Sequence, residues 1–378
     1  MKRVYVAATE QHAGKTTVCL GLYRAAQQRG LRTCFIKPVG QRYIVQEEEQ
    51  VDEDAVLFKQ AMGAEGVLKS LSPVTIPRGF TREYIFAPDP DSIHRPILDA
   101  MDSLATGHDV AIVEGTGHAG VGSVIDASNA RVAQLLDAGV IIVTGGGIGR
   151  CIDQICLNRA LFDRHDVPIV GAVINKVYQE KYDKVSAAVR QGLANQGIEC
   201  LGVVPYRREL TYPTMRNLQE EFGLEVLCGG EHLDSKVQDI IVAAMEPQDM
   251  INYLSEGSLV VVPGDRVDNI LASINAHLMR DRGTGPEIAG LLLTGGFVPH
   301  LSIVNILCAV DVPVLLVDED TATAAFKVRS LVPKITARDS QKVEMAAQVV
   351  QQHVDVNRVF AAAGLDSGQQ AQATQPGE

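Results

Sequence analysis

The sequence lacks the features that would place it among membrane or nucleic-acid-binding proteins. No apolar stretch reaches the roughly 18 residues of a membrane helix, so we expect no membrane segment. The first apolar run ends at Thr9 and Glu10, which is too short for a signal peptide and typical of a first strand. No basic run occurs and the formal net charge is −12, which argues against a nucleic-acid surface. We therefore expect a cytoplasmic protein.

Cysteine is present but shows no pattern. The sequence contains no CxxC pair, and its seven cysteines are scattered, at positions 19, 34, 151, 156, 200, 228 and 308. Such scatter is typical of buried, reduced thiols in a cytosolic protein, so we expect neither a disulfide nor a cysteine metal site.

The length and composition indicate a folded protein with two domains. The chain has 378 residues, of which 46% are hydrophobic and 21% charged. We expect residues 1–212 to form one domain, residues 213–223 a linker and residues 224–356 a second, smaller α/β domain. Residues 357–378 are predicted to be a disordered tail, because residues 366–378 are rich in Gln and Gly and contain no large apolar residue.

Short apolar runs alternate with helical patterns in the first domain. The predicted strands cover residues 4–8, 33–37, 110–114, 140–144, 169–175 and 200–205. Continuous apolar strands are buried on both faces, which predicts a doubly wound, mostly parallel sheet. In the second domain we expect strands at residues 259–262, 288–293 and 314–317, and helices at 271–278 and 322–331. Ligands of such sheets bind at the carboxyl ends of the strands.

A Gly-Lys-Thr sequence lies between the first strand and a helical pattern. Strand, turn and helix together predict a P-loop, in which Gly14 and the N–H groups of Lys15, Thr16 and Thr17 cradle phosphates. Lys15 would reach the β- and γ-phosphates and the Thr16 hydroxyl would bind Mg²⁺. The loop departs from the strict pattern because Thr9 stands where a glycine is usual. The alternative is an ordinary turn with a surface lysine.

Three further charged residues are candidates for the same site. Glu114 ends an apolar strand and could hold Mg²⁺ directly or through water, or it could be a solvated strand end. Asp54 follows an acidic run and is either a second Mg²⁺ ligand or part of a solvated loop. Lys37 precedes a proline at a strand exit, where it could stabilise a transferred phosphoryl group or be a surface lysine.

Asn175 ends the fifth predicted strand. Its amide offers a donor and an acceptor to an adenine edge, and an Asn-Lys pair could equally cap a helix. His118, in the loop after Glu114, receives no firm role. Because the polar features all follow strand ends, we predict a single nucleotide site at that edge.

Together these residues resemble the dethiobiotin synthetase-like and cobyrinic acid a,c-diamide synthase-like P-loop group. The resemblance covers residues 1–210 and rests on an ordered set of short motifs: Gly-Lys-Thr at 14–16, Lys-Pro-Val at 37–39, Asp-Ala at 54–55, Val-Glu-Gly at 113–115, Ile-Asn at 174–175 and Gly-Val-Val-Pro at 202–205. It implies ATP and Mg²⁺ as cofactors, with Lys15 and Lys37 on the phosphates and Asn175 on the adenine. The same resemblance implies that Thr16, Asp54 and Glu114 serve Mg²⁺. The turn at residues 145–150 departs from the group's pattern, so we do not expect dethiobiotin synthesis.

The second domain resembles the DRTGG domain. Its signature stands here as Asp265-Arg266 and, at a later strand exit, residues 294–296, Thr-Gly-Gly. A P-loop domain followed by a DRTGG domain resembles the N-terminal regulatory half of long bacterial phosphate acetyltransferases, here as a stand-alone version.

Two functions follow from these resemblances. The first is a nucleotide-responsive regulatory module with weak ATPase activity, which forms a homodimer and acts on a separately encoded acetyltransferase. The second is an ATP-dependent ligase that phosphorylates a small carboxylate substrate.

Overall fold

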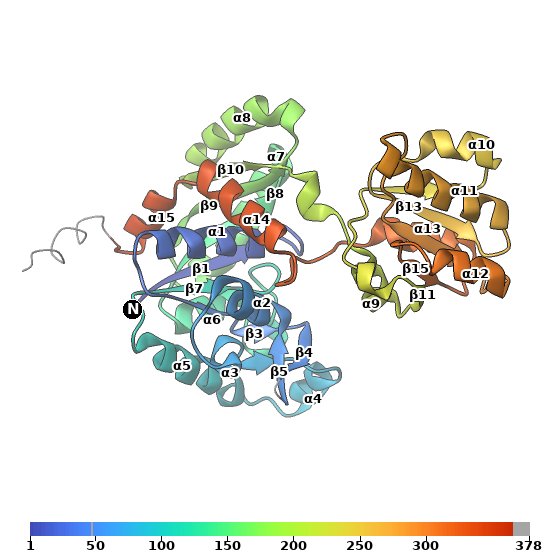
Figure 1. The fold of residues 1–378 in the computed structure, drawn as a ribbon. Coiled ribbons are helices and arrows are strands. Elements are labelled where there is room, and N and C mark those ends of the chain that lie inside the picture. The colour runs from blue at the N-terminus through green and yellow to red at the C-terminus, as the bar shows by residue number, and fades with distance from the viewer. Residues whose placement is uncertain (47, 366–378) are drawn as a thin grey trace, which may run out of the picture. The chain divides into compact units, whose positions relative to one another are not determined.

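The computed structural model describes residues 1–46 and 48–365, and its chain divides into two compact units (Figure 1). Unit 1 contains residues 1–207 together with the described residues from 335 onward, and unit 2 contains residues 208–334. The first unit is therefore built from two separate stretches of the chain.

A six-stranded sheet forms the centre of unit 1. Its order is β10-β9-β8-β1-β7-β2 and all neighbouring strands are parallel. This arrangement confirms the predicted doubly wound P-loop sheet. The strands are β1 (Lys2–Ala8), β2 (Thr33–Ile36), β7 (Val110–Glu114), β8 (Gly139–Gly145), β9 (Ile169–Val177) and β10 (Cys200–Pro205).

Helices and two small sheets complete unit 1. Strand β3 (Val39–Gly40) pairs with β6 (Val74–Thr75), and β4 (Tyr43–Gln46) pairs antiparallel with β5 (Glu49–Asp52). The helices before unit 2 are α1 (Lys15–Gln28), α2 (Glu53–Met62), α3 (Leu68–Leu71), α4 (Phe80–Phe86), α5 (Asp91–Ala105), α6 (Asn129–Leu135), α7 (Gly149–Arg164) and α8 (Tyr182–Asn195).

The chain returns to unit 1 after residue 334, which corrects the predicted domain limits. Helix α14 (Ser340–His353) packs along α1 and against β10, and α15 (Val356–Ala362) follows it (Figure 1). At the α1–α14 contact, a Cβ on Gly21 would lie only 2.3 Å from Cβ of Val350, so glycine permits this close approach. Residues 335–356 are therefore not part of the second domain, and residues 357–362 are helical because their apolar face is buried here. The rest of the predicted tail, residues 366–378, lies outside the described residues.

Unit 2 contains a five-stranded sheet of order β11-β15-β14-β13-β12, in which only the β11–β15 pair is antiparallel. Its strands are β11 (Glu225–Cys228), β12 (Asp239–Val242), β13 (Ser258–Pro263), β14 (Gly290–Thr294) and β15 (Val314–Leu316). Its helices are α9 (Met215–Phe222), α10 (Pro247–Met250), α11 (Val267–Leu278), α12 (Leu301–Leu307) and α13 (Thr321–Ser330). The unit has apolar core clusters of its own.

The predicted linker is a helix. Thr214 caps α9 and forms a capping box with Asn217: each side chain accepts a hydrogen bond from the other residue's backbone N–H, at 3.2 and 2.9 Å. Met215 and Leu218 on the same helix are fully buried in the core of unit 2. The polar residues between and after them are half-buried or exposed, which is why the sequence resembles a linker.

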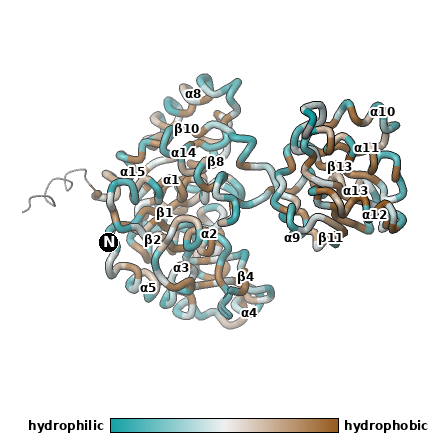
Figure 2. Tube along the Cα trace, in the orientation of Figure 1, coloured by the Kyte–Doolittle hydropathy of each residue, from teal (hydrophilic) through white to brown (hydrophobic). Residues whose placement is uncertain are grey.

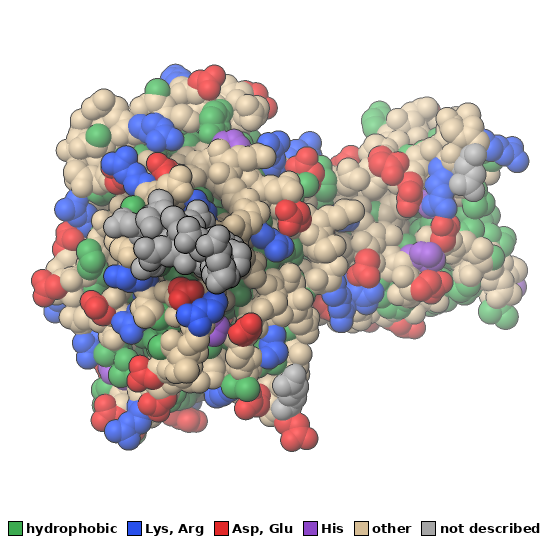
Figure 3. All heavy atoms as spheres, turned by 60° about the vertical axis from the view of Figure 1, so that its left-hand side comes forward, with side chains coloured by type: hydrophobic (Ala, Val, Ile, Leu, Met, Phe, Trp, Pro, Cys, Tyr) green, Lys and Arg blue, Asp and Glu red, His purple; other side chains and the backbone are tan. Residues whose placement is uncertain are grey.

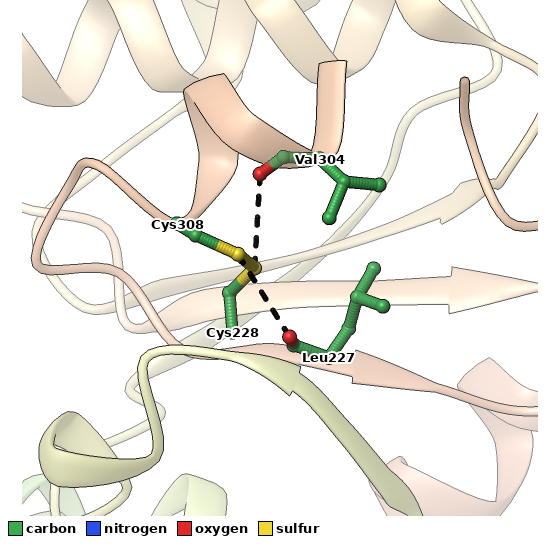
Figure 4. The surroundings of a disulfide bond; sticks show 4 residues. All are labelled: Leu227, Cys228, Val304 and Cys308. Carbon is green, nitrogen blue, oxygen red and sulfur yellow. Dashed lines mark hydrogen bonds between the residues drawn. A yellow bond between two sulfur atoms is a disulfide. The ribbon is translucent and has the colours of Figure 1, made fainter. Parts of the chain in front are cut away.

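Cys228 and Cys308 form a disulfide, so the prediction of reduced thiols is wrong for this pair (Figure 4). The bond joins the end of β11 to the residue that follows α12, across a Cα–Cα distance of 5.0 Å. The two cysteines are 80 residues apart, and only the tertiary fold brings them together. Cys19, Cys34, Cys151, Cys156 and Cys200 are free.

The surface pattern agrees with the composition. Apolar residues gather in the strand layers (Figure 2), and acidic and basic side chains are interspersed over the face seen in Figure 3. Within the described part of the chain, no helix is both long and apolar enough to span a membrane.

Candidate nucleotide site

The P-loop lies between β1 and α1. Gly14 has a left-handed φ of 102°, and a Cβ there would lie 2.0 Å from Nδ2 of Asn175, so both the backbone and the space require glycine. Lys15 opens α1 and is 9% exposed, while Thr16 and Thr17 follow in the first turn, half-buried. The N-terminus of α1 is thus available to an anion, with a lysine beside it.

A buried lysine links the other predicted residues to the P-loop. Nζ of Lys37 donates to Oδ2 of Asp54 at 2.7 Å and to Oε1 of Glu114 at 2.9 Å. The Thr16 hydroxyl donates to the same Glu114 oxygen at 2.9 Å. Asp54 reaches this position from the start of α2, where the Asp52 side chain accepts its backbone N–H. Two strand exits and two helix N-termini thus place these four residues within one connected set.

Charge and burial shift the pKa values within this set. Burial lowers the pKa of Lys37, but the carboxylates around it, Asp54 first and then Glu114, outweigh burial and hold that pKa well above its ordinary value. Burial raises the pKa of Glu114, and Lys37 opposes the shift. Burial, reinforced by the positive charge of Lys37, lowers the pKa of Lys15. The ammonium group of Lys37 therefore stays charged and balances part of the negative charge of the two carboxylates.

The side-chain oxygens of Thr16, Asp54 and Glu114 fit one hard cation whose remaining ligands are waters and phosphates. Oε2 of Glu114 is buried and has no hydrogen-bond partner among the described residues. The described residues contain no group of three or more His, Cys, Asp or Glu side chains able to hold a metal. Mg²⁺ normally takes one or two carboxylates, with waters and phosphates as its remaining ligands. Thr16, Asp54 and Glu114 match that requirement together with a nucleotide.

Asn175 lies beneath the P-loop. Its side chain is buried, Nδ2 donates to the Ala13 carbonyl at 2.9 Å, and Oδ1 accepts the backbone N–H of Lys176 at 2.9 Å. Nζ of Lys176 donates to the His12 carbonyl at 2.6 Å. The two residues therefore hold the loop's carbonyl groups. The adenine contact of Asn175 stays a prediction.

Sequence reasoning missed Lys176 and the network behind Glu114. Tyr5 donates to Oδ1 of Asn129 at 2.8 Å, and the Asn129 amide donates to the carbonyls of Thr116 and His118. This network holds the loop after β7, and Tyr5, Thr116 and Asn129 line a cavity of about 20 Å³ beside Gly115. The position of Lys176 directly after a strand-end Asn was a usable signal. Asn129 is distant in sequence from Tyr5, and no local pattern marked the two as partners.

The DRTGG residues lie at two adjacent strand exits of unit 2. Gly264, after β13, donates its N–H to the Thr294 carbonyl at the end of β14 at 3.1 Å. Arg266 precedes α11 and forms an ion pair with Asp268, in the first turn of that helix, at 2.9 Å. Gly295 and Gly296 have left-handed φ values of 79° and 68°, which glycine adopts without strain. The signature therefore builds two interlocked turns.

The parallel sheet, the loop around Gly14 and the lysine–carboxylate set define a P-loop nucleotide-binding protein. The AAA domain family matches residues 2–214, and the chain belongs to this family. The DRTGG domain matches residues 217–331. Both matches confirm the predicted order of domains.

Phosphate acetyltransferases are similar to most of this chain. The protein from Nitratidesulfovibrio vulgaris is 28% identical over 369 residues, covering 93% of this chain and 50% of that protein. The Pseudomonas putida protein is 28% identical over 370 residues, covering 94% of this chain and 51% of that protein. The chain thus spans about half the length of the curated relatives it matches.

Solved structures align with parts of this chain at low identity. The MinC:MinD cell division protein complex of Aquifex aeolicus aligns at 14% identity and a TM-score of 0.37, covering 56% of this chain and 84% of that chain. The CBS and DRTGG regulatory region of Clostridium perfringens pyrophosphatase, complexed with diadenosine tetraphosphate, aligns at 21% identity and a TM-score of 0.25. That match covers 32% of this chain and 47% of that chain.

Proposed function

We propose that the protein is a Mg-ATP-binding, nucleotide-responsive regulatory module with weak ATPase activity. The observation that carries the proposal is the connected set of Thr16, Glu114, Lys37 and Asp54 beside the P-loop. Lys15 and Lys37 would contact the phosphates, and the helix N-terminus would add backbone N–H groups. Thr16, Asp54 and Glu114 would hold Mg²⁺, which neutralises phosphate charge. These roles extend the nucleotide binding that the family implies.

The regulatory part of the proposal rests on domain order and on the small size of one cavity. The DRTGG domain follows the P-loop domain, and the relatives that share both parts are phosphate acetyltransferases. We propose that the module forms a homodimer and acts on an acetyltransferase, encoded separately or elsewhere in its own chain. The cavity beside Gly115 encloses about 20 Å³, which is room for about one water and not for an organic carboxylate.

Calorimetry and light scattering on the full chain test the proposal. Mg-ATP should bind the wild type, and Lys15→Ala should weaken binding at least tenfold, or about 1.4 kcal/mol. Mg-ATP should also change the dimer's size or proteolysis pattern in the wild type and not in Lys15→Ala. Equal ATP affinity of both proteins would remove the P-loop assignment. A monomer that nucleotide leaves unchanged would remove the regulatory role.

A carboxylate-activating ligase is the alternative, because the Lys37 ammonium lies between Asp54 and Glu114 next to the P-loop, where it could stabilise a transferred phosphoryl group. Phosphate release from ATP, measured across a panel of small carboxylic acids, separates the two functions. A ligase should turn over much faster with one acid than without any. A regulatory module should show the same slow release throughout.

A further inference from the structure

The Asn175 side chain is not placed to hydrogen-bond a nucleobase. The side chain is 4% exposed, and both its amide nitrogen and its oxygen already have partners in the protein. A base edge read by hydrogen bonds needs an amide that offers its donor and acceptor at the surface. A base-binding surface is therefore expected from neighbouring residues that lie farther out along the strands.

Two tyrosines occupy such positions. Tyr178 directly follows β9 and Tyr206 directly follows β10, at the carboxyl ends of two neighbouring parallel strands. Their ring centroids lie 5.2 Å apart with the ring planes inclined at 60°, and Tyr178 is 60% exposed. The N–H of Tyr206 donates to the Val177 carbonyl at 2.8 Å, which holds the two strand ends together. An exposed aromatic ring is thus held on a rigid strand end.

The same strand connects these rings to the P-loop. Asn175 and Lys176 contact the loop carbonyls of Ala13 and His12, and Tyr178 comes two residues after Lys176. A strand advances about 3.3 Å per residue, so Tyr178 lies at most ~10 Å along the chain from Asn175. Ligands of parallel sheets bind along this carboxyl edge.

We propose that the Tyr178 ring, supported by Tyr206, is the stacking surface for the nucleobase of the bound nucleotide. This inference rests on the proposed nucleotide binding and names the residue that receives the base. Aromatic stacking accepts any base because every base has a π-face. The site should therefore discriminate little between ATP and GTP, in contrast to the adenine preference predicted from Asn175.

The chain contains no tryptophan, so Tyr178→Trp places a single fluorescent reporter at the proposed surface. Mg-ATP and Mg-GTP should quench its emission saturably, whereas Mg-tripolyphosphate should bind without quenching. Tyr178→Leu should weaken Mg-ATP binding about tenfold and leave tripolyphosphate binding unchanged. Tyr253→Leu is the matched control, because Tyr253 is also exposed, at 59%, and lies in unit 2.

The outcomes distinguish this inference from the proposed function. If Tyr178→Leu binds Mg-ATP as tightly as the wild type, or loses ATP and tripolyphosphate equally, the stacking role is overturned. The same holds if ATP binds Tyr178→Trp without changing its emission. If the wild type binds neither ATP nor tripolyphosphate, the proposed nucleotide site itself fails.

Discussion

Removal of the buried ammonium group of Lys37 should destabilise unit 1 and create a requirement for a divalent cation. The Lys37 side chain is 6% exposed and lies 2.7 and 2.9 Å from the carboxylates of Asp54 and Glu114. Lys37→Met keeps most of the side-chain volume but leaves two buried carboxylates without their cation. Breaking a buried ion pair on one side typically costs about 3–5 kcal/mol, and we expect a loss of that size.

Urea unfolding of the full chain, followed by circular dichroism with and without Mg²⁺, measures this effect. Mg²⁺ should restore about half or more of the lost stability in Lys37→Met and change the wild type less, because there the Lys37 ammonium already balances part of the carboxylates' charge. Lys59→Met is the matched control. Nζ of Lys59, in the same unit, donates to a backbone carbonyl, that of Gly66, and not to a carboxylate. The control should lose less than about 1 kcal/mol.

Two results would refute this reasoning. If Lys37→Met unfolds at the same urea concentration as Lys59→Met, the lysine does not hold the carboxylates in solution. If Lys37→Met is destabilised but Mg²⁺ stabilises it no more than the wild type, then Asp54 and Glu114 do not form a cation site.

Three further predictions concern packing, the disulfide and pH. Gly21→Ala should lower the free energy of unfolding by about 1–3 kcal/mol, because the added methyl group overpacks against Val350. Adding Val350→Ala should recover part of that loss in urea unfolding. Strictly additive losses from the two substitutions would contradict this contact. Cys228→Ser, or a reductant acting on the wild type, should destabilise unit 2 by about 4 kcal/mol, because the bond closes a loop of 80 residues; unchanged unfolding after reduction would show that the bond is absent in solution. Because the pKa of Lys37 is raised in the folded protein, the stability that Lys37 contributes is complete below its unfolded pKa of 10.5 and is lost as pH rises through the higher native pKa. Alkaline titration should therefore destabilise the wild type more steeply than Lys37→Met. Parallel plots of unfolding free energy against pH for the two proteins would argue against a raised pKa.

The strands and the P-loop follow from local sequence alone. Continuous apolar runs predicted the six strands of the central sheet of unit 1 to within about two residues at each end, because strands of a parallel sheet are buried on both faces. Gly14, Lys15 and Thr16 are adjacent in sequence, so their pattern and its strand–helix context could be read directly. The same holds for the order of the two domains, which the family matches confirm.

Contacts between distant segments were decided by the tertiary structure. Residues 340–353 have an ordinary amphipathic helix pattern, which does not say that their partner is α1, more than 300 residues earlier. The Cys228–Cys308 bond likewise depends on β11 and α12 meeting in space.

The candidate site divides in the same way. The sequence alone identified Lys37 and Glu114 at strand ends and Asp54 after an acidic run, but each could equally have been an ordinary solvent-exposed residue. Only the folded chain places the Lys37 ammonium between both carboxylates, because the exits of β2 and β7 and the start of α2 converge there. It also turns Asn175 inward to the P-loop and leaves Tyr178 exposed at the strand's end. Residue types set the chemistry that is available, and packing decides which groups meet and which face solvent.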